Sequence, residues 1–189
     1  MIFLSKNIKR SITQNLVIIM SSLLIVAFLN NAFFVDLMNV YPLSENLKYI
    51  ASIVTGLILL NIIIIRIFCM LVGLKIGVGI ILLMSTTSAY FMDSYNIIVD
   101  QVMLTNIAMT DLGEIYDLLS WRLLIYILIF TVIPCIFVFK IKIKKQHTLA
   151  RLKKDVLFIL ACTSGIFLLV FMSSKFYASF LPGTQRNTV

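Results

Sequence analysis

The most constraining feature of the sequence is a set of long apolar runs that contain no charged residue. A helix that spans a bilayer needs about 20 consecutive, largely apolar residues, with a range of about 17–25. Five uncharged runs meet this requirement: Ser11–Val35, Tyr49–Ile65, Ile76–Met92, Leu123–Phe139 and Val156–Ser174. These runs account for most of the 189 residues. The sequence therefore predicts a multi-pass membrane protein.

We expect each run to be helical, because a lone strand in hydrocarbon would leave its backbone N–H and C=O groups without partners. A β-barrel would require alternating polar and apolar residues, and these runs are continuously apolar. The first run is too long for a signal peptide and lacks a small-residue cleavage site, so we expect an uncleaved span. The predicted fold class is an all-α membrane protein with five transmembrane helices, at about residues 12–34, 49–70, 74–91, 121–139 and 156–174.

Charge is distributed unequally between the two sides that five crossings would create. Twelve Lys and Arg residues and one acidic residue fall on one side, and four basic and seven acidic residues fall on the other. Cytoplasmic loops carry the excess of Lys and Arg, so this bias predicts a cytoplasmic N-terminus, a basic cytoplasmic loop over 140–155 and an external C-terminus. The net charge of +8 is thus a topology signal, and we expect no nucleic-acid partner.

The external loop over residues 92–120 is the most polar part of the chain. Five of the eight acidic residues lie between Met92 and Asp117, with no Lys or Arg among them. Apolar residues are interspersed at helical spacing, so we expect short amphipathic helices here, between the third and fourth spans, lying on the membrane surface. This loop is where we expect function to reside.

Three polar residues in this loop, Asn106, Thr110 and Glu114, are spaced at i, i+4 and i+8. In one continuous helix they would form a single polar ridge. Glu114 would suit the ammonium group of a phospholipid head, and Asn106 and Thr110 would suit its phosphate or hydroxyl oxygens. Spacing alone favours the alternative, the solvated face of a surface helix.

The rest of the chain offers little chemistry. His147 lies in the basic loop, and Cys69, Cys135 and Cys162 lie in or beside apolar runs without metal-ligand spacing. We therefore predict no metal site and no catalytic residue in this chain. A small transporter would need polar residues in the middle of its spans. Only Asn61 approaches this, so a transporter is the lowest-ranked function.

Several local features carry structural expectations. Arg66 is expected to snorkel to the cytoplasmic surface. A short external loop is expected over Phe34–Lys48, with Ser44 capping the helix that follows. Gly73-x-x-x-Gly77 matches the small-residue packing motif of membrane helices. The hydroxyl residues at 85–88 are expected to form contacts between helices, and Pro134 is expected to kink the fourth span.

Short motifs run through nearly the whole chain. They are Phe33-Phe34-x-Asp36, Tyr41-Pro42-Leu43-Ser44-x-Asn46-Leu47, Ala89-Tyr90-Phe91-Met92-Asp93-x-Tyr95 and Ser173-Ser174-x-x-Tyr177-Ala178-Ser179-Phe180. The most specific is Asp100-x-x-Met103-x-x-Asn106-x-x-x-Thr110-Asp111-x-x-Glu114-x-x-Asp117-Leu118-Leu119. With these motifs the chain resembles the N-terminal membrane domain of bacterial lipid A phosphoethanolamine transferases, a family that includes the mobile colistin-resistance enzymes.

The resemblance implies five spans with a cytoplasmic N-terminus, in agreement with the count from the apolar runs. It also implies that Asn106, Thr110 and Glu114 approach the active site of a periplasmic catalytic domain and help to bind the phosphatidylethanolamine donor, with Tyr95 nearby. The resemblance therefore favours the head-group role for the polar ridge. One departure is Asn96, which stands where the family usually has Gly.

In that family the chemistry belongs to a zinc-dependent, alkaline-phosphatase-like (sulfatase-like) domain with a threonine nucleophile. The single His and the acidic residues of this chain do not supply such a site, so we expect no zinc in it and no transfer by this chain alone. We expect it to act over residues 1–189 as the inner-membrane domain of a transferase that moves phosphoethanolamine from phosphatidylethanolamine to lipid A and so confers polymyxin resistance. A catalytic domain would act in cis or in trans. The alternatives are an inactive, truncated remnant and an orphan membrane scaffold.

Overall fold

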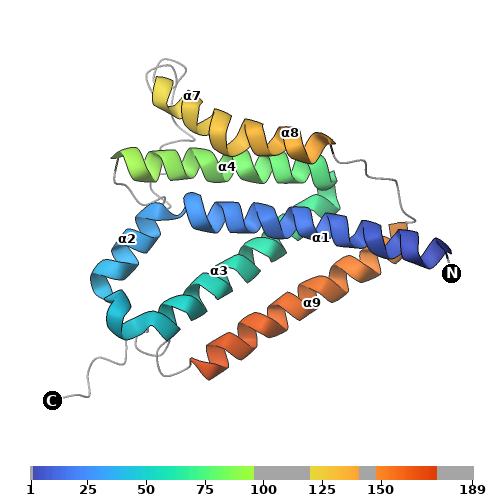
Figure 1. Ribbon diagram of the computed structural model, residues 1–189, viewed down its shortest axis with the longest axis horizontal. Helices are drawn as coiled ribbons and strands as arrows, with labels where there is room; N and C mark the ends of the chain where they lie inside the picture. Colours follow the sequence, from blue (N-terminus) through green and yellow to red (C-terminus); the bar gives the residue numbers. More distant parts are fainter. Residues whose placement is uncertain (1, 96–119, 141–147, 174–189) are drawn as a thin grey trace.

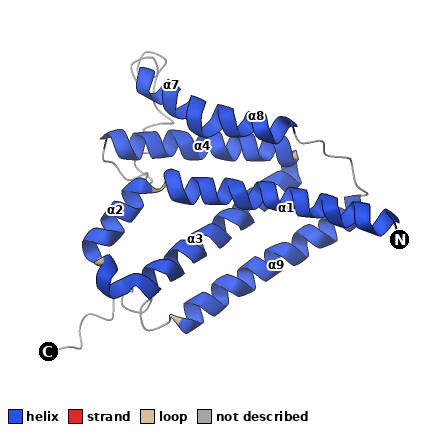
Figure 2. Cartoon of the chain, viewed as in Figure 1, coloured by secondary structure: helices blue, strands red, loops and turns tan. Residues whose placement is uncertain are grey.

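The computed structural model describes residues 2–95, 120–140 and 148–173 (Figure 1). Every regular element in these ranges is a helix (Figure 2). The elements are α1 (Ile2–Phe28), α2 (Asn31–Val40), α3 (Leu43–Val72), α4 (Leu74–Tyr95), α7 (Trp121–Ile127), the π-helix η1 (Leu128–Val132), α8 (Ile133–Lys140) and α9 (Thr148–Met172). The all-α prediction is confirmed. The amphipathic helices expected within 92–120 lie almost entirely outside the described residues.

Four of these stretches are long and apolar enough to cross a membrane: Asn46–Val72, Leu74–Ser94, Trp121–Lys140 and Leu152–Met172. The pair Gln14–Phe28 and Asn31–Val40, bent by 57°, makes a fifth span if it crosses as one unit. Many large apolar side chains on these helices face outward, as a hydrocarbon environment allows. The chain is a multi-pass membrane protein.

The first apolar run forms two helices where we expected one continuous span over 12–34. α1 ends at Phe28, and the chain turns through Asn30 into α2. The side-chain amide of Asn30 donates a hydrogen bond to the carbonyl oxygen of Ile25, at 3.0 Å, and so folds back onto the last turn of α1. Asn side chains compete in this way with helix continuation, which accounts for the break at Asn30 and Asn31.

The connection from α2 to α3 is shorter than the predicted loop. α2 extends to Val40, and α3 begins at Leu43 with Pro42 at its N-cap position. Proline suits the start of a helix because its fixed φ is compatible with helical geometry and it has no N–H to leave unpaired. The prediction that Ser44 caps this helix is therefore wrong.

Gly73 forms the turn between α3 and α4. Gly73 has a φ of +93°, in the region that residues with a Cβ rarely adopt. A Cβ on Gly77 would lie 3.0 Å from the Cα of Cys69, so the two helices meet there at backbone distance. The predicted small-residue contact thus exists, and it joins two helices of the same chain.

The core lies where α1, α3 and α4 meet. Ile18 of α1, Ile65 of α3 and Leu82 of α4 are fully buried, and Ser22 donates a hydrogen bond to the carbonyl of Ile58 at 2.9 Å. α9 packs against α3, and the α7–η1–α8 span packs against α4 (Figure 1). The two outer spans therefore lie on different helices of a shared core.

The predicted irregularity at Pro134 takes the form of the π-helix. Pro134 has no N–H to donate to the carbonyl of Phe130 four residues earlier, and Phe130 lies within η1. A π-helix uses i→i+5 hydrogen bonds, and such turns commonly occur inside α-helices at functional positions. The widened turn lets the span continue through the proline.

Candidate functional site

The described residues place both ends of the polar loop next to each other. α4 ends at Tyr95, and α7 begins after Ser120, whose side chain accepts a hydrogen bond from the backbone N–H of Leu123 at 3.2 Å. Ser is a favoured N-cap residue because its oxygen accepts one of the helix's open N–H groups. The predicted site residues Asn106, Thr110 and Glu114 lie outside the described residues, and the side chain of Tyr95 does too.

Two polar contacts join α4 to α7 at this end. The hydroxyls of Tyr90 and Ser120 form a short hydrogen bond, and the Tyr126 hydroxyl donates to Oδ2 of Asp93 at 3.2 Å. Tyr90 is buried, Tyr126 is half-buried and Asp93 is exposed. The two helices are therefore held together where the polar loop leaves and rejoins the bundle.

Aromatic rings continue this cluster toward the middle of the bundle. The Tyr90 and Tyr126 rings meet edge to face, with centroids 5.6 Å apart. The Phe130 ring lies 5.5 Å from Tyr126 and 6.1 Å from Phe28 of α1. Such ring pairs stabilise packing beyond the apolar area they bury. The junction of α4 and α7 is thus linked to α1 by a continuous row of rings.

A buried pair of hydroxyl groups joins α4 to η1, further from the polar loop than the Tyr90–Ser120 contact. Thr131 of η1 donates to the hydroxyl of Thr86 in α4 at 2.9 Å, and both side chains are buried. Thr87 instead donates to the carbonyl of Leu83 in its own helix, at 2.8 Å. The expectation that residues 85–88 join helices is thus confirmed at Thr86.

Asp93 is an exposed carboxylate at this junction that can accept hydrogen bonds from an ammonium ion. A carboxylate offers acceptor positions on both oxygens, and the Tyr126 hydroxyl contacts Oδ2. Within the described residues, the ion pair that forms is between Arg66 and Asp155, and no Lys or Arg pairs with Asp93. The site can therefore accept hydrogen bonds from a primary ammonium group beside an aromatic ring.

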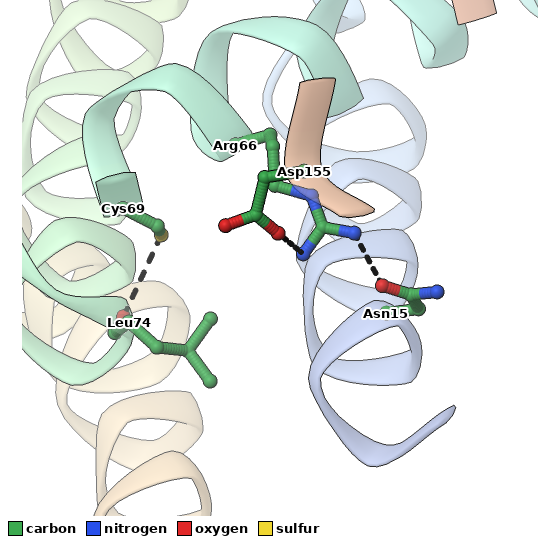
Figure 3. A network of polar contacts seen from close by, with 5 residues as sticks. All are labelled: Asn15, Arg66, Cys69, Leu74 and Asp155. Atoms are coloured by element: carbon green, nitrogen blue, oxygen red, sulfur yellow. Dashed lines mark hydrogen bonds and ion pairs between the residues drawn. The ribbon is translucent and has the colours of Figure 1, made fainter. Parts of the chain in front are cut away.

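A second polar network, centred on Arg66, joins α3 to α1 and α9 (Figure 3). Arg66 forms an ion pair with Asp155 at 3.3 Å, donates a hydrogen bond to the side-chain oxygen of Asn15, and lies 4.5 Å from the ring centre of Phe158. Arg66 is 5% exposed, so the prediction that it snorkels to the surface is wrong. Its partners on α1 and α9 contact the two terminal nitrogens of the guanidinium inside the bundle.

Other polar residues are satisfied locally. The Asn61 side chain donates to the carbonyl of Leu57 in its own helix at 3.0 Å, so it gives no support to a transport pathway. Within residues 2–95, 120–140 and 148–173, no three His, Cys, Asp or Glu side chains gather closely enough to hold a metal ion. The described residues therefore do not fit a zinc site.

Two residues at the junction of α4 and α7, Ser120 and Tyr126, were not predicted from the sequence. Ser120 immediately precedes an apolar run, which is a helix N-cap signal that could have been recognised. Tyr126 follows Trp121 and Arg122 at the start of a span, where Tyr is common in the interfacial aromatic belt. Its pairing with Asp93 depends on which helices pack together, and the sequence pattern alone does not specify that.

Apolar helices with polar contacts at both ends of their bundle define a multi-pass helical membrane domain. Residues 57–185 match the family model described as phosphoethanolamine transferase EptA/EptB. The chain belongs to this family, and the resemblance inferred from its motifs is confirmed.

Similar proteins agree with this assignment. The chain is 31% identical over 117 residues to the phosphatidylethanolamine transferase Mcr-2 of Escherichia coli, covering 62% of this chain and 22% of Mcr-2. It is 28% identical over 175 residues to Mcr-1 of the same organism, covering 91% of this chain and 32% of Mcr-1. The chain thus spans a third or less of the length of these relatives.

The fold matches a solved structure. The integral membrane protein lipooligosaccharide phosphoethanolamine transferase A (EptA) of Neisseria meningitidis superposes with a TM-score of 0.76 at 20% sequence identity. The match covers 87% of this chain and 31% of that chain. At this identity the likeness establishes the shared fold.

Proposed function

We propose that the chain is the membrane domain that anchors a phosphoethanolamine transferase in the bacterial inner membrane and binds the head group of phosphatidylethanolamine for transfer to a lipid A phosphate. Its membership of the family and its similarity to two phosphatidylethanolamine transferases support this proposal. Each transferred group carries an ammonium to a lipid A phosphate. A membrane surface that carries this modified lipid A then attracts cationic peptides such as polymyxins less strongly, which would give colistin resistance.

The proposed topology places the N-terminus and the basic loop 140–155 in the cytoplasm, and the C-terminus and the loop 92–120 in the periplasm. The inequality of charge between the two sides supports it, because twelve of the sixteen basic residues fall on the cytoplasmic side. A zinc-dependent catalytic domain, in cis or in trans, would then meet the loop at the periplasmic surface.

The observation that carries the site assignment is the junction of α4 and α7. The pairs Tyr90–Ser120 and Tyr126–Asp93 hold the two ends of the loop that contains Asn106, Thr110 and Glu114. In the proposal Glu114 binds the ammonium of the donor, Asn106 and Thr110 bind its phosphate oxygens, and Tyr95 lies beside them. Fixed loop ends would confine these groups near one place at the membrane surface.

Lipid binding by the full chain tests this proposal. The protein is placed in nanodiscs that contain phosphatidylethanolamine and phosphatidylglycerol. Native mass spectrometry then counts the lipids that stay bound to the protein after it is released from the nanodisc. Glu114→Gln should lower the preference for phosphatidylethanolamine about tenfold, because a charge-assisted hydrogen bond is lost. Asp117→Asn removes a charge from the same loop and should leave the preference unchanged. Equal effects of the two substitutions would refute the role of Glu114.

Activity provides a second readout. The full chain is expressed with a family catalytic domain supplied in trans, and phosphoethanolamine on lipid A is measured by mass spectrometry. Asn106→Ala and Glu114→Ala should each reduce the modification while protein levels stay constant. Unchanged modification in both variants would contradict the assigned roles.

A further inference from the structure

Two apolar grooves border the outer face of α1. The larger, about 560 Å³, lies between α1 and α8, and its walls include Leu16 and Met20 on one side and Ile133 and Phe137 on the other. This volume lies within the range of about 300–1,000 Å³ typical of small-molecule sites. Ser21 is the one polar residue in its lining. The groove therefore suits a flexible apolar ligand.

The second groove, about 320 Å³, lies between α1 and the α2–α3 pair. Its lining is entirely apolar and includes Phe34, Met38 and Ile50. Leu23 and Ala27 of α1 belong to both grooves. The two grooves are thus neighbours on either side of one short stretch of α1, and the bend after α1 creates the second of them.

The larger groove leads to the polar junction of α4 and α7. Phe28 lines the groove and contacts the ring of Phe130, which in turn contacts Tyr126. The hydroxyl of Tyr126 donates to the exposed carboxylate of Asp93. An apolar surface therefore continues, through adjoining rings, to a negatively charged group at the end of the bundle.

We infer that the two grooves bind the two acyl chains of one phospholipid, and that Asp93, beside Tyr126, is a further hydrogen-bond acceptor for the ammonium of its head group. This inference rests on the proposed function, since it assigns the donor lipid a binding site within the membrane domain. Two narrow grooves flanking Ala27 match a two-chain ligand, whereas a partner helix is a single rod about 10–12 Å wide. The Asp93 carboxylate complements a primary ammonium.

Photocrosslinking of the full chain tests the inference. The protein is placed in nanodiscs with phosphatidylethanolamine that carries a diazirine in the middle of one acyl chain, and labelled residues are mapped by mass spectrometry. The groove walls on α1 and α8 should be labelled about threefold or more above the exposed face of α9. That face is an internal reference, because its exposed residues, such as Leu157 and Phe167, line neither groove. Even labelling of both faces would overturn the inference.

A substitution at the shared wall gives an independent measurement. Ala27→Trp should fill both grooves and lower groove labelling about threefold or more. Ala161→Trp makes the same change on the exposed face of α9 and should leave the labelling unchanged. Ala27 is exposed, so the larger side chain does not enter the core. Ile133→Trp fills only the larger groove, and normal labelling in both groove variants would contradict the inference.

A second probe separates this inference from the proposed function. Phosphatidylglycerol with the same diazirine should label the grooves less than the phosphatidylethanolamine probe does. Equal labelling by the two probes, abolished in both cases by Ala27→Trp, would retain the acyl-chain grooves and reject amine recognition. Absence of groove labelling, with the effect of Glu114→Gln on lipid preference intact, would reject the grooves and retain the proposed function.

Discussion

Nη1 of Arg66 lies 3.3 Å from Oδ1 of Asp155, and the two side chains are only 6% and 7% exposed. The pair joins α3 to α9, and the hydrogen bond from Arg66 to Asn15 adds α1 to the same contact. Buried charges are tolerated when they are paired and hydrogen-bonded. This network therefore fixes the position of α9, which otherwise exposes much of its surface.

Asp155→Asn should destabilise the protein by about 3–5 kcal/mol, because it leaves the buried Arg66 without its counter-ion. Thermal unfolding in detergent, followed by circular dichroism, measures the effect. Lys153→Gln, on the exposed side of the same helix, serves as the control and should change stability by about 0.5 kcal/mol or less. The double variant Arg66→Met/Asp155→Leu should recover most of the loss. Equal stability of Asp155→Asn and the control would show that the pair contributes little.

Gly77→Ala should separate α3 from α4. The added Cβ would lie 3.0 Å from the Cα of Cys69 and 3.1 Å from its backbone nitrogen, and backbone atoms cannot move aside as a flexible side chain can. We expect a loss of about 1–3 kcal/mol in the same unfolding assay. Gly56→Ala is the matched control, since a Cβ there meets nothing within 4 Å. It should be neutral or slightly stabilising, because Ala favours helix over Gly.

Thr86→Val should weaken the contact between α4 and η1. The substitution removes the acceptor of the Thr131 hydrogen bond while keeping the side-chain shape. Hydrogen bonds between membrane helices contribute about 0.6 kcal/mol on average and up to about 1.7 kcal/mol, so the loss should fall in this range. Thr87→Val, whose hydroxyl bonds to its own helix, should have a smaller effect. A larger loss at Thr87 would rule out this account of the hydroxyl cluster.

Accessibility to a membrane-impermeant maleimide tests the proposed topology. Ser94 and Lys153 are both exposed, and they lie on opposite sides of the proposed membrane. Ser94→Cys should react in cells whose outer membrane alone is permeable, and Lys153→Cys should react only after the inner membrane is opened. The unsubstituted chain, with Cys69 and Cys162 buried, provides the background. The reverse pattern would place the polar loop in the cytoplasm and overturn the proposed function.

The helical class and the membrane spans could be predicted because each depends on local composition. A long uncharged run must satisfy its backbone hydrogen bonds internally whatever its neighbours are, so Tyr49–Ile65 alone indicates a helix. The small-residue contact at Gly77 could be predicted for the same reason, since close packing needs the absence of a side chain. These features require no knowledge of the tertiary arrangement.

The buried ion pair could not be predicted in this way. Arg66 and Asp155 each border an uncharged run, and there they resemble charges at a membrane surface. Their pairing becomes apparent only once α3 and α9 are known to pack together. The break at Asn30 was missed because two amides in an apolar run change its mean hydropathy little, although they redirect the backbone. The roles of Asn106, Thr110 and Glu114 remain predictions, since these residues lie outside the described part of the chain.

The widened turn at Leu128–Val132 sets the rotation of α8 relative to α7. In an α-helix each residue advances the side-chain direction by about 100°, so one additional residue in a turn reorients everything after it by that angle. Tyr126 precedes the turn and faces Asp93, while Ile133 and Phe137 follow it and face α1. An insertion or deletion of one residue here would therefore change the direction of Ile133 and Phe137 relative to Tyr126. The polar contact and the groove wall would no longer be oriented together, although none of their side chains would have changed.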